Sequence, residues 1–307
     1  MTEPAVSVCI PTRNGAAWIA ETIASATSQD TDLEVVISDD ASTDATVEIA
    51  LASGDPRVHV EAAPRPLGMA ANWNRAIALA QGTYVKLLMQ DDALLPGALG
   101  IQQQLLERNP SAGFAFGPRL LHGDGSVAAA AWIAKYWAPH EALGLSQELI
   151  SGRDLLNALL RRRLRANAIG EPSVVLMRMS ALEQAGPFHP DLRQLTDMDM
   201  WIRLASIGDA AFDATPIALF RVHGDSATMH NRSTGDAWLD RLRIVDGARR
   251  RKATHQLVGL THYAAAIAAG GIDVVRGLAR RERSVAATWR ELRTWRSRPP
   301  STRDVTR

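Results

Sequence analysis

Short runs of apolar residues alternate with longer segments of helical periodicity through the first 121 residues. The runs have the length of buried strands, and each intervening segment is long enough for a helix. The predicted strands are residues 6–10, 33–38, 58–62, 84–89 and 114–121, and the predicted helices are residues 16–29, 44–53, 68–80 and 96–109. This alternation predicts βαβ units and an α/β fold with a mostly parallel sheet.

The regular alternation stops after residue 121. Residues 122–150 begin with a turn-like Gly–Asp–Gly–Ser segment and then group three aromatic residues, so we expect a loop or an insertion there. Further on, the pattern predicts helices over 151–163 and 197–207 and strands over 174–177 and 211–222. Only helical patterns remain after residue 235. We therefore expect a body of residues 1–235 and a helical C-terminal region of residues 236–307.

Charge is distributed unevenly along the chain. The net charge of +1 combines +7 in residues 276–307 with −6 in residues 1–275. A basic tail suggests an acidic partner surface such as phospholipid or nucleic acid, although a solvated basic helix is the commoner outcome. Val285, Trp289, Leu292 and Trp295 recur at helical spacing, as in helices that lie in a membrane interface or pack on protein. We expect packing on the chain or on a second copy, keep peripheral membrane contact as a hypothesis, and expect no nucleic-acid partner.

Cysteine usage and apolar length indicate a compartment. The single cysteine, Cys9, lies within an apolar run and has no partner for an internal disulfide. No apolar run approaches the roughly 20 residues of a membrane-spanning helix, and the first residues lack a basic signal region. These features predict a soluble, cytoplasmic protein.

Two pairs of neighbouring acids follow predicted strands. Asp39 and Asp40 end the second apolar run, and Asp91 and Asp92 follow the fourth. Because the carboxyl ends of parallel strands face one crevice, the four carboxylates could converge there. Clustered carboxylates raise each other's pKa, and a divalent cation that carries a diphosphate removes the repulsion. The pattern therefore predicts a nucleotide-sugar site.

Four segments carry a family resemblance, and a fifth, residues 194–204, extends it. Residues 8–15, 37–44, 68–74 and 88–92 occur in the order and spacing of family 2 glycosyltransferases with the GT-A fold, which they closely resemble. The resemblance implies a three-layer α/β sandwich with a mostly parallel central sheet, here followed by a helical C-terminal appendage. It also implies a glycosyltransferase that takes its sugar from a nucleotide diphosphate.

The resemblance assigns the nucleotide side of the site. It implies that Asp40 accepts a hydrogen bond from the base, with Asp39 close by, and a carboxylate facing a pyrimidine imide N–H is physically consistent with this. The competing interpretation of Asp39 is a helix cap. The residues implied to bind the nucleotide are Pro11, Thr12, Asn14, Asp39, Asp40 and Asp91.

The metal motif departs from the family pattern, because Met89 occupies the place of its first acid. Asp91 and Asp92 are left to share ribose and metal contacts, and the sequence does not decide which of them binds the ion directly. Relatives carry an Arg-x-His segment here matched by Arg221 and His223, so His223 is either a further ligand for Mn²⁺ or Mg²⁺ or an ordinary loop residue. Arg221 either neutralises diphosphate oxygens or pairs with Asp199 or Asp225.

Asp197 matches the position of the family's catalytic base. An acid on the first turn of a helix is favoured by the helix dipole and can reach a substrate proton. The competing interpretation is a simple N-cap. Asp199 lies two residues further on and points elsewhere on the helix, so we expect it to serve the structure.

Other nucleotide enzymes are excluded by missing motifs. The chain has no Gly-x4-Gly-Lys-Ser/Thr or Gly-x-Gly-x-x-Gly sequence, which removes kinase, dehydrogenase and nucleotidylyltransferase interpretations. We expect a metal-dependent, inverting glycosyltransferase that uses a UDP- or dTDP-sugar. Its acceptor would be a saccharide, a lipid-linked sugar or a small molecule in polysaccharide, glycolipid or glycoside synthesis. The alternative, suggested by Met89, is a non-catalytic sugar-nucleotide-binding protein or partner subunit.

Overall fold

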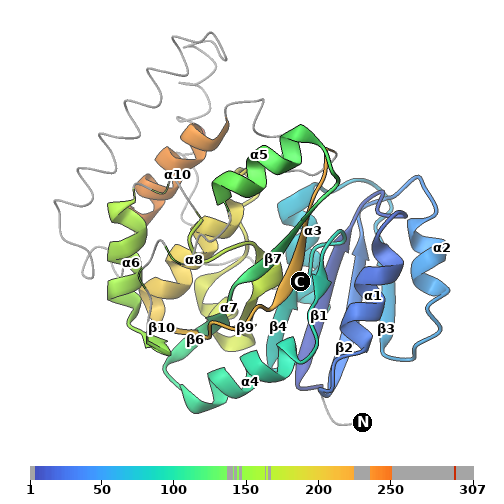
Figure 1. Ribbon diagram of the computed structural model, residues 1–307, viewed down its shortest axis with the longest axis horizontal. Helices are drawn as coiled ribbons and strands as arrows, with labels where there is room; N and C mark the ends of the chain where they lie inside the picture. The colour runs from blue at the N-terminus through green and yellow to red at the C-terminus, as the bar shows by residue number, and fades with distance from the viewer. Residues whose placement is uncertain are drawn as a thin grey trace, which may run out of the picture.

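An eight-stranded sheet runs through the centre of the molecule, with helices on both faces (Figure 1). The computed structural model describes residues 4–136, 141, 144, 147–162, 164, 167–224, 236–250 and 294. The strand order is β3 (Val58–Ala62), β2 (Leu33–Asp39), β1 (Val6–Thr12), β4 (Tyr84–Leu87), β9 (Val175–Arg178), β6 (Ala112–Phe116), β10 (Asp209–Phe212) and β8 (Leu149–Ile150). Strands β1–β4 are parallel, as are β6 and β10, whereas β9 runs antiparallel to β4 and β6, and β8 to β10. The prediction of an α/β fold with a mostly parallel sheet is confirmed.

Helices connect most of the strands along the chain. Those described are α1 (Ile19–Thr27), α2 (Thr46–Leu51), α3 (Met69–Ala78), α4 (Ala98–Arg108), α5 (Val127–Tyr136), α6 (Gly152–Arg161), α7 (Met179–Ala185), α8 (Thr196–Ile207) and α10 (Asp236–Arg250), with a 3-10 turn, η2, at Pro172–Val174. All seven residues of β1 and of β2 are buried, as expected for parallel strands covered on both faces. Thr12 is level with Asp39 in the β1–β2 register, so the segments that follow these strands emerge at one edge of the sheet.

Two predicted strands are each divided in the structure. Residues 114–121 separate into β6 and β7 (Arg119–Gly123), and residues 211–222 separate into β10 and β11 (Ala218–Val222). The division occurs where Gly117 lies against Ile217, leaving no room for a Cβ atom, and where Pro118 has no N–H for a ladder. Strands β7 and β11 instead join β5 (Ala93–Leu94) in a small three-stranded sheet.

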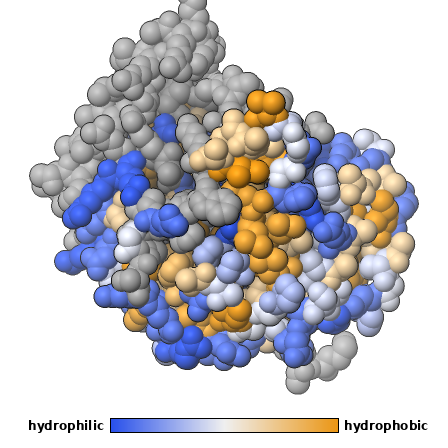
Figure 2. All heavy atoms as spheres, viewed as in Figure 1, coloured by the Kyte–Doolittle hydropathy of each residue, from blue (hydrophilic) through white to orange (hydrophobic). Residues whose placement is uncertain are grey.

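The segment 122–150 was predicted as irregular, and this was wrong for part of it. It contains α5, whose alanine-rich sequence gives no polar face from which a helical period could be recognised. Figure 2 shows an apolar band across the middle of the molecule, in the region of α5 and the small sheet. Val127 and Leu120 are exposed in these two elements.

Helix α10 packs into the core of the described part of the chain. Ile244, Val245 and Ala248 are buried in the same cluster as the central sheet. The predicted division at residue 235 stays a prediction, and the predicted amphipathic tail helix lies outside the described residues. Among the described helices, none combines the length and the apolar character that crossing a membrane requires.

Asp240 of α10 joins this helix to the segment that leads into α8. Its side chain is fully buried, and its Oδ2 accepts hydrogen bonds from the backbone N–H groups of Arg193 (3.0 Å), Gln194 (2.7 Å) and Leu195 (3.1 Å). Arg243 contributes a partner charge 3.4 Å from Oδ1. One carboxylate thereby satisfies three successive amides directly before α8 begins.

Replacing Asp240 should therefore destabilise the whole chain. Asp240→Ala leaves three amides without this acceptor, and we expect it to lower the free energy of unfolding by at least about 3 kcal/mol. Asp154→Ala is the matched control, because Asp154 is an exposed acid that also accepts a hydrogen bond. We expect it to cost less than about 1 kcal/mol. Urea unfolding measures both, and equal losses would contradict the bracing role.

Lys86 is a fully buried cation in the middle of β4. Its Nζ donates to Oε1 of Gln102 at 2.7 Å, and the amide of Gln102 donates to two backbone carbonyl groups. Burial lowers the pKa of Lys86 well below its ordinary value. The folded chain consequently binds this proton less tightly than the unfolded chain, which holds it up to about pH 10.

This difference in protonation predicts a pH dependence of stability. Where the folded amine is neutral and the unfolded one charged, the unfolded state binds one more proton, so stability rises with pH by about 1.4 kcal/mol per unit. Lys86→Met removes this contribution and leaves every other titrating group in place. We expect the wild-type free energy of unfolding, relative to Lys86→Met, to increase with pH between the folded-state pKa and about 10. A pH-independent difference in urea unfolding would refute the neutral lysine.

Candidate active site

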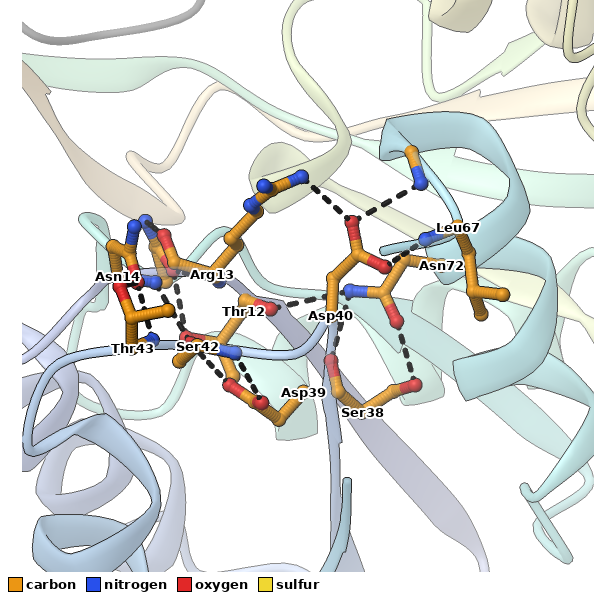
Figure 3. Close-up of polar contacts among 12 residues, drawn as sticks. Thr12, Arg13, Asn14, Ser38, Asp39, Asp40, Ser42, Thr43, Leu67 and Asn72 are labelled. Carbon is orange, nitrogen blue, oxygen red and sulfur yellow. Dashed lines mark hydrogen bonds and ion pairs between the residues drawn. The ribbon is translucent and has the colours of Figure 1, made fainter. Parts of the chain in front are cut away.

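Figure 3 shows the residues at the exits of β1 and β2, which lie together around two short turns. The backbone N–H of Asn14 donates to Oγ of Ser42 at 2.8 Å, and Oδ1 of Asn14 accepts from the N–H of Thr43 at 2.9 Å. Asn14 adopts the left-handed conformation, with φ of 50°, which asparagine tolerates better than most residues. The turn after β1 is thus fixed to the turn after β2.

The two acids after β2 have different surroundings (Figure 3). Asp39 is buried, and its carboxylate accepts from the backbone N–H of Ser42 at 2.8 Å and from the Ser42 hydroxyl. It therefore closes the turn at residues 39–42 and does not cap α2, whose N-cap is Ala45. Asp40 is also buried and accepts from the N–H groups of Leu67 (2.5 Å) and Gly68 (3.1 Å).

Arg13 and Gln90 extend the site from β1 to the second acid pair. Arg13 is half exposed, and its Nη1 lies 3.6 Å from Oδ2 of Asp40. Oε1 of Gln90 accepts from Oγ1 of Thr12 and from the N–H of Arg13, both at 2.7 Å. A Cβ atom on Gly15 would lie 2.6 Å from this same oxygen, so Gly15 allows the close approach. Gln90 is a part of the site that the sequence did not predict.

Asp91 and His223 form a pair at the edge of the sheet. Oδ2 of Asp91 lies 2.9 Å from Nε2 of His223, and the Asp91 side chain is 21% exposed. The ring of Trp18 lies 5.6 Å from the His223 ring. The structure thereby joins two of the predicted metal ligands, which are 132 residues apart in the chain.

Asp92, the next residue in the chain, has no exposed surface. Its Oδ2 accepts from the hydroxyl of Ser173 at 2.5 Å, and its Oδ1 accepts from the backbone N–H of Arg221 at 3.2 Å. Burial, and then the charge of Asp91, raise the pKa of Asp92 well above its ordinary value. Both oxygens are engaged by the protein, so Asp91 is the better placed of the two acids to meet a ligand.

Arg221 contacts residues that the sequence did not suggest. Its guanidinium pairs with Glu21, donates to the carbonyl oxygen of Asp91 at 2.8 Å, and lies 5.2 Å from the centre of the Trp18 ring. Asp199, one of the acids suggested as a partner, instead pairs with Arg203 at 2.9 Å. Asp225, the other suggested partner, lies outside the described residues.

The donor set fits a divalent cation only in part. No group of three or more His, Cys, Asp or Glu side chains within the described ranges has the geometry of a metal site. Two adjacent ligands of an octahedral ion are about 3 Å apart when each metal–ligand distance is about 2.1 Å, and the 2.9 Å between Asp91 and His223 matches this spacing. A diphosphate would supply the remaining oxygen ligands.

Asp197 lies in the first turn of α8, as predicted. Its Oδ2 accepts from Nδ2 of Asn167 at 2.6 Å, and its Oδ1 accepts from the N–H of Met198 at 2.7 Å. Burial, together with the negative charge of Glu171, raises the pKa of Asp197 to about 7, despite these two hydrogen bonds. Such a carboxyl group can accept a proton near neutral pH.

Hydrogen bonds, chain adjacency and the charge of Glu171 connect the surroundings of Asp40, Asp91 and Asp197. Arg13 links Asp40 to Gln90, which immediately precedes Asp91 in the chain. Ser173 binds Asp92 and lies two residues after Glu171, whose charge raises the pKa of both Asp92 and Asp197. The predicted nucleotide, metal and catalytic residues therefore occupy neighbouring positions, although they come from separate stretches of chain.

The segment 167–173 is the main part of the site that the sequence analysis did not identify. It supplies Asn167, Glu171 and Ser173, and Glu171 pairs with Arg119 at 3.0 Å. The sequence signal was present, because a Gly–Glu–Pro turn at residues 170–172 directly precedes a predicted strand.

Comparison with known proteins places this geometry in a family. The sequence profile of Glycosyl transferase family 2 matches residues 7–146. An uncharacterised protein of Mycobacterium tuberculosis is 32% identical over 247 residues, which cover 79% of this chain and 75% of that protein. Chondroitin synthase of Pasteurella multocida is 28% identical over 75% of this chain, but the match spans only 22% of the synthase. The succinoglycan biosynthesis protein ExoU of Rhizobium meliloti is 31% identical over 66% of this chain and 57% of its own length.

Solved structures show the same fold. S. aureus TarS in complex with UDP-GlcNAc has a TM-score of 0.67 at 16% identity, covering 94% of this chain and 80% of that one. A mannosyltransferase from Pyrobaculum calidifontis in complex with GDP-Man and Mn²⁺ has a TM-score of 0.55 at 19% identity, covering 96% and 85%. The predicted GT-A fold is thereby confirmed. The profile match, the mycobacterial relative and the order of the motifs together show that this chain belongs to glycosyl transferase family 2.

Proposed function

We propose that this glycosyltransferase transfers a sugar from a UDP- or dTDP-sugar to an acceptor hydroxyl group with inversion at the anomeric carbon. Asp197 is the base, and Asp91 and His223 hold a Mn²⁺ or Mg²⁺ ion. The observation that carries the proposal is the position of Asp197. It lies at the start of α8 with a pKa of about 7, beside the edge that carries the other acids.

The exits of β1 and β2 provide the nucleotide site in this proposal. Asp40 faces the imide N–H of a pyrimidine base and accepts from it, since a carboxylate can accept more bonds than the two that Leu67 and Gly68 donate. Pro11, Thr12 and Asn14 line the base pocket from β1. The half-exposed guanidinium of Arg13 offsets the charge of Asp40.

Asp91 and His223 bind the ion, and Asp92 supports them from below. A bound divalent ion supplies Lewis-acid stabilisation of the departing nucleoside diphosphate. Ser173 and the backbone N–H of Arg221 hold Asp92 in a fixed orientation. Through its side chain, Arg221 fixes the Asp91 backbone, so it orders the metal side of the site, and its guanidinium charge also favours the diphosphate.

Asp197 performs the proton transfer on the acceptor side. Its carboxylate takes the acceptor hydroxyl proton as the hydroxyl oxygen bonds to the anomeric carbon, and the bond from that carbon to the diphosphate breaks. A single displacement from the opposite face inverts the stereocentre. A base with a pKa near the working pH combines a useful ionised fraction with a useful driving force for proton transfer.

The acceptor is assigned by class only. The named relatives include chondroitin synthase and succinoglycan biosynthesis proteins, which supports a saccharide or lipid-linked saccharide in polysaccharide assembly. Glu171 and Asp197 lie on the acceptor side, and the charge of Glu171 acts directly on the base. These acids favour a hydroxyl-bearing, uncharged sugar ring at the attacking position.

Two substitutions separate the roles of the acids. Asp197→Asn should lower turnover about 10²–10⁴-fold and leave donor binding intact, because only the base is lost. Asp91→Asn should instead weaken Mn²⁺-dependent binding of UDP at least tenfold, because a metal ligand is lost. Calorimetry with UDP and Mn²⁺ measures binding, and UDP release from UDP-sugars measures turnover. Asp154→Asn, an exposed acid on α6, is the control. Equal loss of UDP affinity in the two site variants would contradict these assignments.

A panel of UDP-, dTDP- and GDP-sugars with Mn²⁺ distinguishes the enzyme from a non-catalytic binder. We expect slow hydrolysis of at least one UDP- or dTDP-sugar in the absence of acceptor, with water in place of the hydroxyl group. Hydrolysis should disappear in Asp197→Asn. Tight binding of a sugar nucleotide with no hydrolysis and no transfer would support the binding protein.

The pKa of Asp197 also sets a pH dependence. The base works only when it is ionised, so kcat should be half-maximal at about pH 7 on its acidic side and fall tenfold per unit below that. The physical cause is burial, which favours the neutral acid. The pH–rate profile of donor hydrolysis between pH 5 and 9 tests this. An acidic limb near pH 4, the range of an ordinary carboxyl group, would contradict a buried base.

A further inference from the structure

Asn167, in the turn at residues 167–170, is hydrogen-bonded both to Asp197 and to its own turn. The two protons on Nδ2 of Asn167 have two acceptors, Oδ2 of Asp197 at 2.6 Å and the carbonyl oxygen of Gly170 at 2.7 Å. Its Oδ1 accepts from the backbone N–H of Gly170 at 3.1 Å. The amide oxygen is therefore bound within the turn, and the amide nitrogen donates both within the turn and to Asp197.

These contacts permit only one orientation of the Asn167 amide. If the group were flipped, its oxygen would face two acceptors, the Asp197 carboxylate and the Gly170 carbonyl, and its nitrogen would face the Gly170 N–H. Three favourable contacts would become repulsive ones. The donor is consequently directed at Asp197 by the backbone of its own turn.

Helix α8 holds this turn at a second point. Nε1 of the fully buried Trp201 donates to the same Gly170 carbonyl oxygen at 3.1 Å. Asp197 and Trp201 are four residues apart and so lie on one face of α8. Gly170 has φ of 113°, and a Cβ atom there would lie 2.6 Å from Val174, so the turn needs glycine at this position. The turn is thus fixed against α8 one helical turn away from the base.

Few charges act on this arrangement. Glu171, directly after the turn, raises the pKa of Asp197, and Arg119 on β7 pairs with Glu171 at 3.0 Å. On α8 itself, Asp199 is paired with Arg203. On α10, Asp240 accepts from the amides of residues 193–195. The direct hydrogen bond from Asn167 is therefore the side-chain contact that opposes burial and Glu171 at the Asp197 carboxylate.

We propose that Asn167 is the positioning residue of the catalytic base: its amide fixes the rotamer of Asp197 before substrates bind and favours the ionised carboxylate. The role of Asp197 as base rests on the proposed function, whereas the action of Asn167 on the carboxylate does not depend on it. A base that is already oriented needs no reorganisation when the acceptor arrives. Asparagine suits this position because it donates without adding a second negative charge.

Carbon-13 NMR of aspartate-labelled protein tests the proposal without any sugar. The Asp197 carboxyl signal is identified by its loss in Asp197→Asn and is titrated in the wild-type protein, Asn167→Ala and Asn167→Asp. We expect Asn167→Ala to raise the pKa of Asp197 by about one unit, since a hydrogen bond to a charged group that is lost is worth about that much. Asn167→Asp should raise it further, because a like charge replaces the donor. Asn109→Ala is the matched control, since Asn109 also donates to a carboxylate, Glu148, but on the surface.

An unchanged Asp197 pKa in folded Asn167→Ala would overturn the proposal. If that variant does not fold, Asn167→Ser answers the same question, because its hydroxyl oxygen can still accept from the Gly170 N–H but the side chain is neutral and too short to reach Asp197. An effect of Asn109→Ala as large as that of Asn167→Ala would equally overturn it. Where donor hydrolysis is measurable, Asn167→Ala should lose about fivefold in kcat at pH 7 and recover most of it at pH 9, with the donor KM unchanged. If the wild-type protein hydrolyses no sugar nucleotide, the proposed function fails while the titration result still stands.

Discussion

Electrostatic repulsion between acids at one edge of the sheet is the constraint on which the site depends. Parallel strands deliver Asp39, Asp40, Asp91 and Asp92 to the same edge, where unpaired carboxylates would oppose folding. Each is given a different partner. Asp39 receives the N–H and hydroxyl groups of Ser42, Asp40 receives two backbone amides, and Asp92 receives a serine hydroxyl and an amide. Asp91 alone meets an imidazole, so the ability to bind a cation is concentrated there.

The acceptor side solves the opposite problem. In the proposed function Asp197 acts as a base, and burial beside Glu171 raises its pKa by destabilising the carboxylate. Burial alone would also leave the side chain free to rotate, but the turn at residues 167–170 is bound to α8 through both Asp197 and Trp201. Asp240 meanwhile fixes the three amides before α8. The reactive group is thus poorly solvated and firmly oriented at the same time, a combination typical of catalytic bases.

The sequence predicted the parts of the molecule that local patterns determine. Apolar runs predicted β1–β4, and the acids that come directly after β2 and β4 were therefore expected at one edge of the sheet. It did not predict Gln90, Asn167 or Ser173, because their importance comes from contacts with residues more than 25 positions away. Arg221 shows the same limit, since its position near the acids was expected but its pairing with Glu21 depends on how α1 packs against β11. The sequence also did not predict that residues 114–121 and 211–222 would each divide into two strands. In both cases one half joins the large sheet and the other joins the small sheet, which composition alone does not reveal.

The absence of an acid at position 89 has a chemical consequence for the proposed metal site. Met89 packs against the hydrophobic core, and its backbone N–H donates to Ser173, so this position supports Asp92 instead of contributing a ligand. The protein ligands that remain are one carboxylate oxygen and one imidazole nitrogen, and a diphosphate completes the set with oxygens. Mg²⁺ strongly prefers an all-oxygen environment, whereas an imidazole ligand suits later divalent ions better. If the proposed site holds an ion through Asp91 and His223, with Met89 in place of the family's first acid, the nitrogen ligand would therefore favour Mn²⁺ over Mg²⁺.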